Sequence, residues 1–503
     1  MNKNTFKAMF RRRIIMALLL LLQIAIFVFV IIASGSAWRF ISVALQLFSI
    51  FVMLHVVTRT DNVPFKTMWL AVTLIVPLFG GVLYLWSRTS THSLASRLKI
   101  IDERSKRLLR AEGIVPCEPP EDCTASRYLR GRGGFPAYSN TRTEYLSPGE
   151  KFFDSLIPAL ESAEKYIFLE FFIIQDGFMW GKILDILKRK AALGVDVRII
   201  YDDVGCFLRL AKTYPEQLAK YGIKCHIFNP FRPFLSAVQN NRDHRKIISV
   251  DGRTAFTGGL NIADEYINRK ERFGYWKDCA LRLDGDAAWS LTVIFLEMWR
   301  LIDKAPDDFE SMRPKDASFE WQDGCVQPFA DSPTDGEYIA AHTFLDIIYN
   351  AKKTLYINTP YLILDNVFID ALCTAAHSGV DVRIITPHHA DKPIVHAATR
   401  SYYRDLLLSG VRIYEFSDGF MHSKTIAADG VTAVIGTSNF DYRSLYLHFE
   451  CGVLLHGSQA VGQLCEDFAE TLGMCQEMRE EDFRRGLPGV ILQSILRLIS
   501  PLL

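Results

Sequence analysis

The N-terminal part of the chain is a succession of long apolar stretches, unlike everything that follows it. Residues 14–34 form the first stretch, directly behind Arg11-Arg12-Arg13, and residues 41–57 and 68–86 form two more. The first stretch is about long enough to cross a hydrocarbon core of roughly 30 Å. We therefore expect residues 1–90 to be a membrane region with about three apolar segments.

The residues around these segments leave the topology open. Ser34-Gly-Ser36-Ala37 resembles a signal-peptide cleavage site, but the apolar run before it is longer than the core of such signals, which favours an anchor. Positive charge favours the cytoplasmic side of a membrane. It lies both before residue 14 and between residues 88 and 110, whereas three full spans would put these clusters on opposite sides.

Beyond the apolar segments the pattern changes to alternating strands and helices. Residues 91–144 have the composition of a basic stretch and linker. Residues 166–173 and 197–201 are apolar runs typical of buried strands, and residues 180–193 have the period of an amphipathic helix. The order recurs at residues 355–358, 367–377 and 382–386. The alternation predicts an α/β fold, with helices over a largely parallel sheet.

This recurrence is an internal duplication. The sequence from Gly194 to Ile200 appears again, letter for letter, from Gly379 to Ile385. Self-similarity over so long a spacing indicates two fused domains of one kind. We expect a first domain at residues 145–310 and a second at residues 311–503. The second ends in an apolar segment, residues 487–503, that either lies at a membrane interface or packs on the core.

Each copy carries the same polar motif, His-x-Lys-x4-Asp. One such motif can arise by chance, but two with the same downstream spacing to a Gly- or Ser-rich stretch and an Asn are hard to explain that way. A duplicated site built on His and Lys indicates chemistry on a phosphodiester. The first copy consists of His244, Lys246, Asp251, Gly258, Gly259 and Asn261, and the second of His422, Lys424, Asp429, Gly436, Ser438 and Asn439.

The motif also predicts its own local geometry. Asp251 and Asp429 are each followed by Gly and stand between β-prone runs, as in tight hairpins. His and Lys two positions apart would project from the same face of one strand. A two-residue turn would put Gly259 opposite His244, and Thr437 opposite His422, so that phosphate could approach backbone N–H groups. The two Asp residues are either turn residues or members of the catalytic group.

Composition narrows the function classes. The net charge is +1 over 503 residues, so no overall positive field indicates a nucleic-acid partner. The 10 Cys are scattered without metal-ligand spacing, so neither disulfides nor a structural zinc are expected. The nucleotide-binding pattern G-x-x-x-x-G-K-[ST] does not occur.

The duplicated motif resembles the His-Lys-Asp signature of the phospholipase D superfamily, and its surroundings are similar to those of bacterial cardiolipin synthases. The similarity runs from about residue 68 to the end and is carried by residues 241–247, 258–266, 275–278, 359–361, 400–403, 419–422 and 498–503. Residues 14–34 are additional to the commoner two-segment layout, and Asp243 stands where Asn is more usual. The resemblance implies two phospholipase D-like α/β/α sandwich domains, related by pseudo-two-fold symmetry and preceded by transmembrane helices.

The resemblance also implies a role for each residue. His244 would attack phosphorus, and His422 would act first as the acid and then as the base. Lys246 and Lys424 would hold the non-bridging oxygens, helped by neutral donors from Asn261 and Asn439. Glu450 would pair with His244, and Asp278 with His422, each reaching across from the opposite half. The implied catalytic group is His244, Lys246, Asp251, His422, Lys424 and Asp429, supported by Gly258, Gly259, Asn261, Asp278, Asn439 and Glu450.

The implied reaction is transfer of a phosphatidyl group from one phosphatidylglycerol to another, through a phosphatidyl-histidine, giving cardiolipin and glycerol. No metal or cofactor is expected, phosphatidylglycerol and cardiolipin are the expected partners, and self-association stays open. The alternatives are a phospholipase D-type hydrolase, another phosphatidyltransferase of the superfamily, and, disfavoured by two complete motifs, an inactive membrane scaffold. We expect a multi-pass protein of the bacterial cell membrane. The side that its catalytic part faces stays open, and the cytoplasmic side is favoured. Extra residues in the first copy, within residues 229–242, are expected to shape access of the lipid headgroup.

Overall fold

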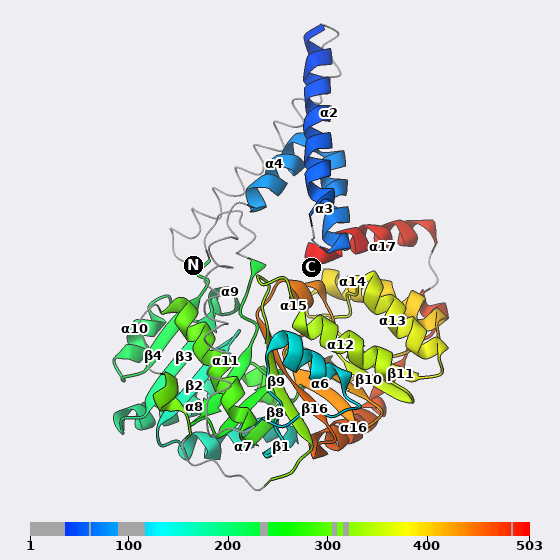
Figure 1. Ribbon diagram of the computed structural model, residues 1–503. Coiled ribbons are helices and arrows are strands. Elements are labelled where there is room, and N and C mark those ends of the chain that lie inside the picture. The colour runs from blue at the N-terminus through cyan, green and yellow to red at the C-terminus, as the bar shows by residue number, and fades with distance from the viewer. Residues whose placement is uncertain are drawn as a thin grey trace.

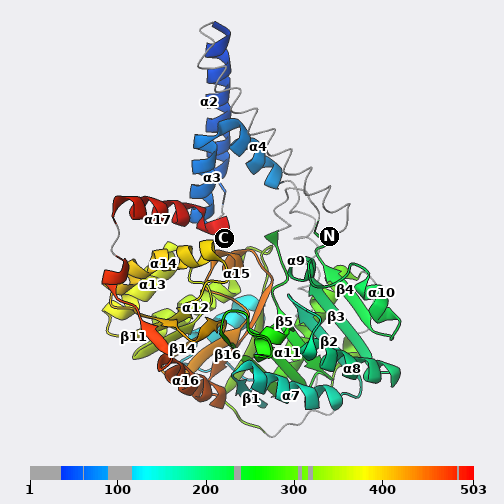
Figure 2. The same ribbon diagram turned by 180° about the vertical axis from the view of Figure 1, so that it is seen from behind.

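The computed structural model describes residues 36–59, 62–88, 116–231, 240–303, 309–314, 321–483 and 486–502. Two α/β halves lie side by side and form the body of the molecule, while the N-terminal helices stand away from it (Figure 1). The view from behind shows the same arrangement, with the C-terminal helix at the foot of the N-terminal helices (Figure 2). The apolar segment at residues 14–34 lies outside the described residues, as do residues 232–239 of the extra segment.

The first half is built on a seven-stranded sheet in the order β1-β8-β6-β5-β2-β3-β4. Its strands are β1 (Thr141–Leu146), β2 (Tyr166–Phe171), β3 (Asp196–Asp202), β4 (Lys224–Phe228), β5 (Lys246–Val250), β6 (Thr254–Gly258) and β8 (Ala280–Gly285). Its helices are α7 (Gly149–Glu161), α8 (Phe178–Ala192), α9 (Asp203–Cys206), α10 (Tyr214–Ala219), η3 (Asp264–Ile267) and α11 (Ala287–Ile302).

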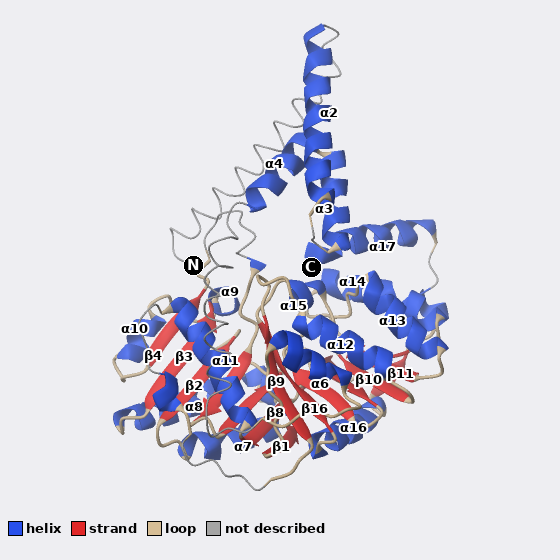
Figure 3. Cartoon of the chain, viewed as in Figure 1, coloured by secondary structure: helices blue, strands red, loops and turns tan. Residues whose placement is uncertain are grey.

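The second half repeats this plan on an eight-stranded sheet, β17-β12-β11-β10-β14-β15-β16-β9. Counted from β9, its order matches the first sheet strand for strand, and β17 is one added edge strand. The strands of both halves lie within the body, with helices around them (Figure 3). The strands are β9 (Cys325–Asp331), β10 (Thr354–Asn358), β11 (Asp381–Pro387), β12 (Arg412–Phe416), β14 (Thr425–Ala428), β15 (Thr432–Gly436), β16 (Glu450–His456) and β17 (Cys475–Glu477). The helices are α12 (Ile339–Asn350), α13 (Asn366–His377), α14 (Pro393–Leu408), α15 (Tyr442–Tyr446), α16 (Gln459–Leu472) and α17 (Leu487–Ile499), with short η4 (Phe309–Met312), η5 (Glu480–Phe483) and η6 (Ser500–Leu502).

Both sheets are mixed, so the prediction of a largely parallel sheet is wrong. In each half three neighbouring strands are parallel, β2-β3-β4 and β10-β11-β12. The remaining pairings are antiparallel. Each motif folds as a hairpin inside its sheet, β5-β6 or β14-β15, whose first strand pairs antiparallel with β2 or β10. The apolar runs were correctly located, since strands buried on both faces read alike in either orientation.

The turn of each hairpin takes three residues, not two. Both Asp251 (φ 53°) and Gly252 (φ 67°) have left-handed backbone conformations, and Arg253 N–H donates to Val250 O at 3.1 Å. The first residues to pair beside the turn are Val250 and Thr254. In the second hairpin they are Ala428 and Thr432. The predicted placement of Gly259 opposite His244, and of Thr437 opposite His422, is therefore wrong by one residue.

The middle of the body is a core shared by the two halves. Helix α11 lies there with most of its residues buried, including Trp289, Phe295 and Trp299, and it packs on strands of its own sheet and on β9 of the other. Helix α16 of the second half packs in return on β1 of the first. A helix that is apolar on nearly all sides has to be buried, and every residue of α11 except Glu297, Arg300 and Ile302 is buried between the sheets.

The halves also exchange short strands. β7 (Tyr275–Lys277) follows the first motif, and β13 (Gly419–Met421) directly precedes the second histidine, and the two pair in parallel as a separate small sheet. A second parallel bridge joins Asp243 to Phe449. The two contacts are related as the halves are, each tying the approach to one motif to the strand region of the other.

The segment expected to be a linker is folded in its described part. Cys117 forms an isolated antiparallel β-bridge with Ala137. Residues 124–133 form α6 (Thr124–Tyr128) and a short π-type turn, η1 (Leu129–Gly133). Ser126 Oγ donates to Gln327 Oε1 at 2.6 Å, and α6 packs on α12, so this segment covers the second half.

In the described part of the chain, three helices precede the body: α2 (Ser36–Val57), α3 (Val63–Ile75) and α4 (Pro77–Arg88). They pack on one another around Val52, Val56 and Tyr84. The apolar segment 68–86 is split at Pro77, because proline has no N–H for the helix and disfavours helical backbone in the residue before it. Among the described residues, none of the helices combines the length and the apolar character needed to cross a membrane.

Candidate active site

The two motif histidines stand at matching places, just before β5 and β14, and each is held by the other half. His244 N–H donates to Phe449 O at 2.9 Å, and His422 N–H donates to Lys277 O at 2.8 Å. These backbone bonds extend the two parallel contacts between the halves. They fix the backbone position from which each imidazole projects.

The imidazole of His244 faces a carboxylate from the second half. Its Nδ1 lies 2.9 Å from Glu450 Oε1 and 3.0 Å from Oε2. Glu450 is fully buried at the start of β16 and also accepts a hydrogen bond from the Thr437 hydroxyl. The ring of Phe172 packs edge-on against His244. With Nδ1 engaged, Nε2 is the nitrogen of His244 that can react.

His422 has the reciprocal partner. Its Nδ1 lies 2.6 Å from Oδ2 of the buried Asp278, whose Oδ1 accepts from the Cys279 N–H at 2.8 Å. Both contacts are those that the resemblance implied. Aromatic rings surround this imidazole on several sides, contributed by Tyr266, Trp276 and Phe420.

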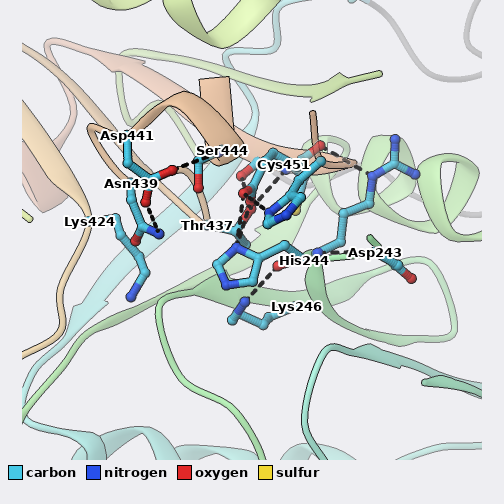
Figure 4. Close-up of polar contacts among 12 residues, drawn as sticks. Asp243, His244, Lys246, Lys424, Thr437, Asn439, Asp441, Ser444 and Cys451 are labelled. Carbon is cyan, nitrogen blue, oxygen red and sulfur yellow. Dashed lines mark hydrogen bonds and ion pairs between the residues drawn. The ribbon is translucent and has the colours of Figure 1, made fainter. Parts of the chain in front are cut away.

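Two buried ammonium groups accompany the imidazoles. Lys246 Nζ donates to His244 O at 2.6 Å. Lys424 Nζ lies 2.8 Å from His422 Nδ1 and also donates to His422 O. Figure 4 shows Lys424 and Asn439 of the second half beside His244 and Lys246 of the first. The charge of Lys246 acts on both imidazoles and on Lys424, so the two imidazoles and the two ammonium groups lie close together.

Burial sets the protonation of these groups. Burial lowers the pKa of Lys246 to about 8 and that of Lys424 to about 7, against the nearby carboxylates. It lowers the pKa of His244 to about 3, although the charge of Glu450 acts in the opposite direction. Burial, with the charge of Lys424, lowers the pKa of His422 well below its usual range. Both imidazoles are therefore neutral at neutral pH, with a lone pair available.

The two carboxyl groups differ. Burial raises the pKa of Asp278 to about 7, against the attraction of Lys424. Burial alone would also raise the pKa of Glu450, but the charge and hydrogen bond of His244 hold it well below its usual range. Glu450 is thus ionised at neutral pH, whereas Asp278 is close to its midpoint.

The two motif asparagines are mostly occupied by protein contacts. Asn261 Oδ1 accepts from the Ile173 N–H at 3.0 Å, and its Nδ2 donates to the Tyr266 hydroxyl at 2.7 Å. Asn439 Nδ2 donates to Asp441 Oδ2 at 3.0 Å, while its buried Oδ1 has no hydrogen-bond partner among the described residues. Each amide nitrogen keeps a second N–H that could point at a ligand.

The prediction that Gly259 leaves room for a phosphate is wrong. A Cβ on Gly259 would come within 2.0 Å of Asp278 Oδ1, and one on Gly258 (φ 151°) within 2.4 Å of Cys279 O. The space beside these glycines is filled by the protein. Gly259 therefore lets Asp278 approach closely enough to reach His422, which places it in support of the second imidazole and not next to a ligand.

The motif aspartates are turn residues, and their assignment to the catalytic group is wrong. The Asp251 carboxylate accepts backbone hydrogen bonds of 2.8 Å from Glu164, Lys165 and Tyr166. Asp429 accepts the equivalent three from residues 352–354. Both lie at the far end of β5 or β14 from the histidine, and both have positive φ, which Asp tolerates better than most residues. They tie each hairpin to the segment before the neighbouring strand.

Sequence reasoning gave no side-chain role to several residues beside the histidines, and it considered Thr437 only as a small residue opposite His422. Thr437 donates to Glu450, and Tyr266 connects Asn261 to the ring of His422. His448 lies with its ring 5.7 Å from that of His244. His448 and Glu450 are two apart at the start of a buried strand, the same spacing as the His and Lys of each motif. That spacing was a usable signal.

Several known proteins are similar to this chain in sequence. A family model described as "Cardiolipin synthase, PLD-like domain" matches residues 156–275 and 344–472, and one described as "Phospholipase_D-nuclease N-terminal" matches residues 47–88. A cardiolipin synthase of Geobacillus sp. is 40% identical over 74% of this chain and 74% of its own length. A cardiolipin synthase of Alkalihalophilus pseudofirmus is 36% identical over 88% of this chain and 89% of its own.

A solved structure is similar in fold. Phosphatidylserine synthase from Haemophilus influenzae superposes with a TM-score of 0.55 at 16% sequence identity, covering 80% of this chain and 98% of that one. The likeness extends over both halves of the body.

Proposed function

The chain belongs to the cardiolipin synthase family of phospholipase D-like proteins, and from that membership we propose that it joins two phosphatidylglycerol molecules into cardiolipin and glycerol. It is a phosphatidyltransferase of this superfamily. The observation that carries the proposed chemistry is the reciprocal pairing, in which each motif histidine directs Nδ1 at a carboxylate of the opposite half.

In the first step Nε2 of His244 attacks phosphorus of the first phosphatidylglycerol. The P–O bond to glycerol breaks, and His422 supplies the proton that the leaving alkoxide needs. Because burial keeps the free imidazole of His422 neutral, this proton must reach His422 when the anionic phosphate is bound, since its charge favours the imidazolium.

In the second step His422 takes the proton from a hydroxyl group of a second phosphatidylglycerol. That oxygen attacks phosphorus, the P–N bond to His244 breaks, and cardiolipin is released. Charge on the non-bridging oxygens grows as phosphorus becomes five-coordinate, and Lys246 and Lys424 stabilise it because they are already in place and poorly hydrated. Glu450 stabilises the charge on the ring of His244 while the phosphatidyl group is attached.

Access to lipid comes from the apolar helices. Exposed apolar side chains gather on α2, with Leu47, Ile50 and Leu54, and on α17, with Leu487, Ile491 and Ile495. Helix α17 contacts α3, and both lie at one end of the body (Figure 1). We propose that this end attaches the protein to the bacterial cell membrane, with the two catalytic halves on the cytoplasmic side. A local supply of lipid acceptor then favours transfer over hydrolysis.

The test uses the purified full chain in phosphatidylglycerol vesicles. Glycerol released in step with cardiolipin is the expected result, and chelators should not lower the rate. Phosphatidic acid formed without cardiolipin would show a hydrolase instead. Sedimentation with vesicles, compared for the wild type and an Ile491→Glu and Ile495→Glu variant of α17, tests the proposed attachment: the variant should bind less.

A further inference from the structure

A third imidazole, that of His448, lies beside the proposed nucleophile His244. The side chain of His448 is 11% exposed, and both of its ring nitrogens are buried without a hydrogen-bond partner among the described residues. Leaving a buried polar group unsatisfied costs on the order of 1–3 kcal/mol. A buried histidine with both nitrogens unused therefore suggests a ligand that the protein alone does not supply.

The unused nitrogens point to a specific set of atoms. His448 Nδ1 lies 3.8 Å from Glu450 Oε1, the same oxygen that is 2.9 Å from His244 Nδ1. One donor atom from each of the three residues falls within 4.8 Å of the others. Two imidazoles and one carboxylate, converging from the ends of β5 and β16, are the donor set of many zinc sites with an open coordination position.

We propose that His244, His448 and Glu450 form a binding site for a divalent transition-metal ion of the zinc class, and that the bound ion inhibits phosphatidyl transfer. Imidazole and carboxylate ligands together select zinc-like ions over magnesium and calcium, which prefer oxygen. The positive charge of Lys246 acts on the same imidazole and opposes a second cation there. Binding is therefore reversible and not that of a structural site.

Inhibition follows from what the ligands otherwise do. A metal ion on His244 and Glu450 removes the ring from its carboxylate and withdraws electrons from the nitrogen that attacks phosphorus. It also adds positive charge where the ring itself must become positive. The protein would thus be active without metal and slowed by zinc, with chelators restoring the rate.

The experiment compares the wild type with His448→Asn, which removes one metal ligand and leaves His244 and Glu450 untouched. Transfer in vesicles is measured at buffered free Zn²⁺, and each protein is scaled to its own zinc-free rate. We expect the half-inhibitory Zn²⁺ concentration to rise at least about tenfold in His448→Asn, and EDTA to restore the wild-type rate. His377→Asn, at the exposed end of α13, is the matched control and should behave as the wild type.

A direct measurement of Zn²⁺ binding can be made even if a variant is inactive. Its result does not depend on the proposed function. Zn²⁺ is titrated into the full chain against a chromophoric chelator. One site should weaken at least about tenfold in His448→Asn and remain in His377→Asn. Cysteine-bound zinc would contribute equally to all three proteins. Equal binding by the wild type and His448→Asn, or equal inhibition of both, would overturn the proposal.

Discussion

The two halves have the same strand order and the same motif, yet their carboxylate–imidazole pairs are not equivalent. Glu450 is held ionised against His244, within reach of the hydroxyl of Thr437 and the ring of His448. Asp278 has a pKa raised by burial to about 7, and its partner His422 is enclosed by aromatic rings. Duplication supplied two similar sites, and their surroundings made one better at supporting a charged ring.

The difference favours one division of labour. An imidazole that carries a phosphatidyl group is cationic for the lifetime of the intermediate, so it benefits most from a fully ionised carboxylate. An imidazole that gains and loses a proton in each turnover benefits from a carboxyl partner that is itself close to its titration midpoint. On this argument His244 is the nucleophile and His422 the acid and base.

The strongest test of the comparison removes each imidazole. His244→Ala and His422→Ala should each lower turnover on the order of 10³-fold or more, because neither the attack nor the protonation has a substitute. A substrate with a nitrophenol leaving group needs no acid. With it, His422→Ala should still release about one equivalent of nitrophenol rapidly, and His244→Ala none.

That burst decides between the two assignments. It is measured by stopped-flow absorbance on folded protein, checked by circular dichroism. A burst from His244→Ala but not from His422→Ala would exchange the roles of the two halves.

The second test neutralises each carboxylate. Glu450→Gln should lower kcat/KM by roughly 10²-fold, because it removes a charge that is fully present at neutral pH. Asp278→Asn should cost only about tenfold, since the Asp278 carboxyl is partly protonated there already. Both rates are measured in vesicles at neutral pH. Equal losses would mean that the two carboxylates support their imidazoles equally.

The third test follows the lysines through pH. A lysine whose pKa is lowered is charged below that pKa and neutral above it, so phosphate stabilisation is lost as the pH rises. For the free enzyme kcat/KM should fall as the pH passes through about 7 to 8, with Lys424 losing its proton before Lys246. Lys424→Arg, which stays charged, should move the fall to higher pH, and by more than Lys246→Arg.

The pH profile of wild type and the two arginine variants, each normalised to its own maximum, provides the measurement. An alkaline fall at the same pH in all three would assign it to another group.

The fourth test concerns a feature in which the halves should be alike. Asp251→Ala and Asp429→Ala each leave three backbone N–H groups without an acceptor and force Ala into a positive φ. Each should lower the free energy of unfolding by about 1–3 kcal/mol. The rate per folded molecule should change less than twofold. Thermal unfolding and active-site titration by the nitrophenol burst measure the two effects, and a large loss of rate in a folded variant would return these residues to the catalytic group.

Much of the fold was readable from the sequence because burial leaves a local record. The apolar run at residues 166–173 became β2, and the amphipathic stretch at residues 180–193 became α8, each within a few residues. Strand direction leaves no such record, because a strand buried on both faces looks the same in parallel and antiparallel pairing. The mixed sheets were missed for that reason.

The site was predicted unevenly for similar reasons. The pairs His244–Glu450 and His422–Asp278 followed from the resemblance, which carries information on contacts across the halves. The register of the hairpin depends on the left-handed backbone at Asp251 and Gly252, and the motif's composition alone does not fix it. His448 was overlooked because a single histidine is usually unremarkable, and its two-residue spacing from Glu450 is a weaker signal than its unused nitrogens and its neighbours in space.

The crossed backbone bonds, His244 to Phe449 and His422 to Lys277, have a consequence for how the molecule can be switched off. A hinge motion that parted the halves would strip both imidazoles of their carboxylates in one event. No half-competent form would remain to hydrolyse lipid without completing the exchange.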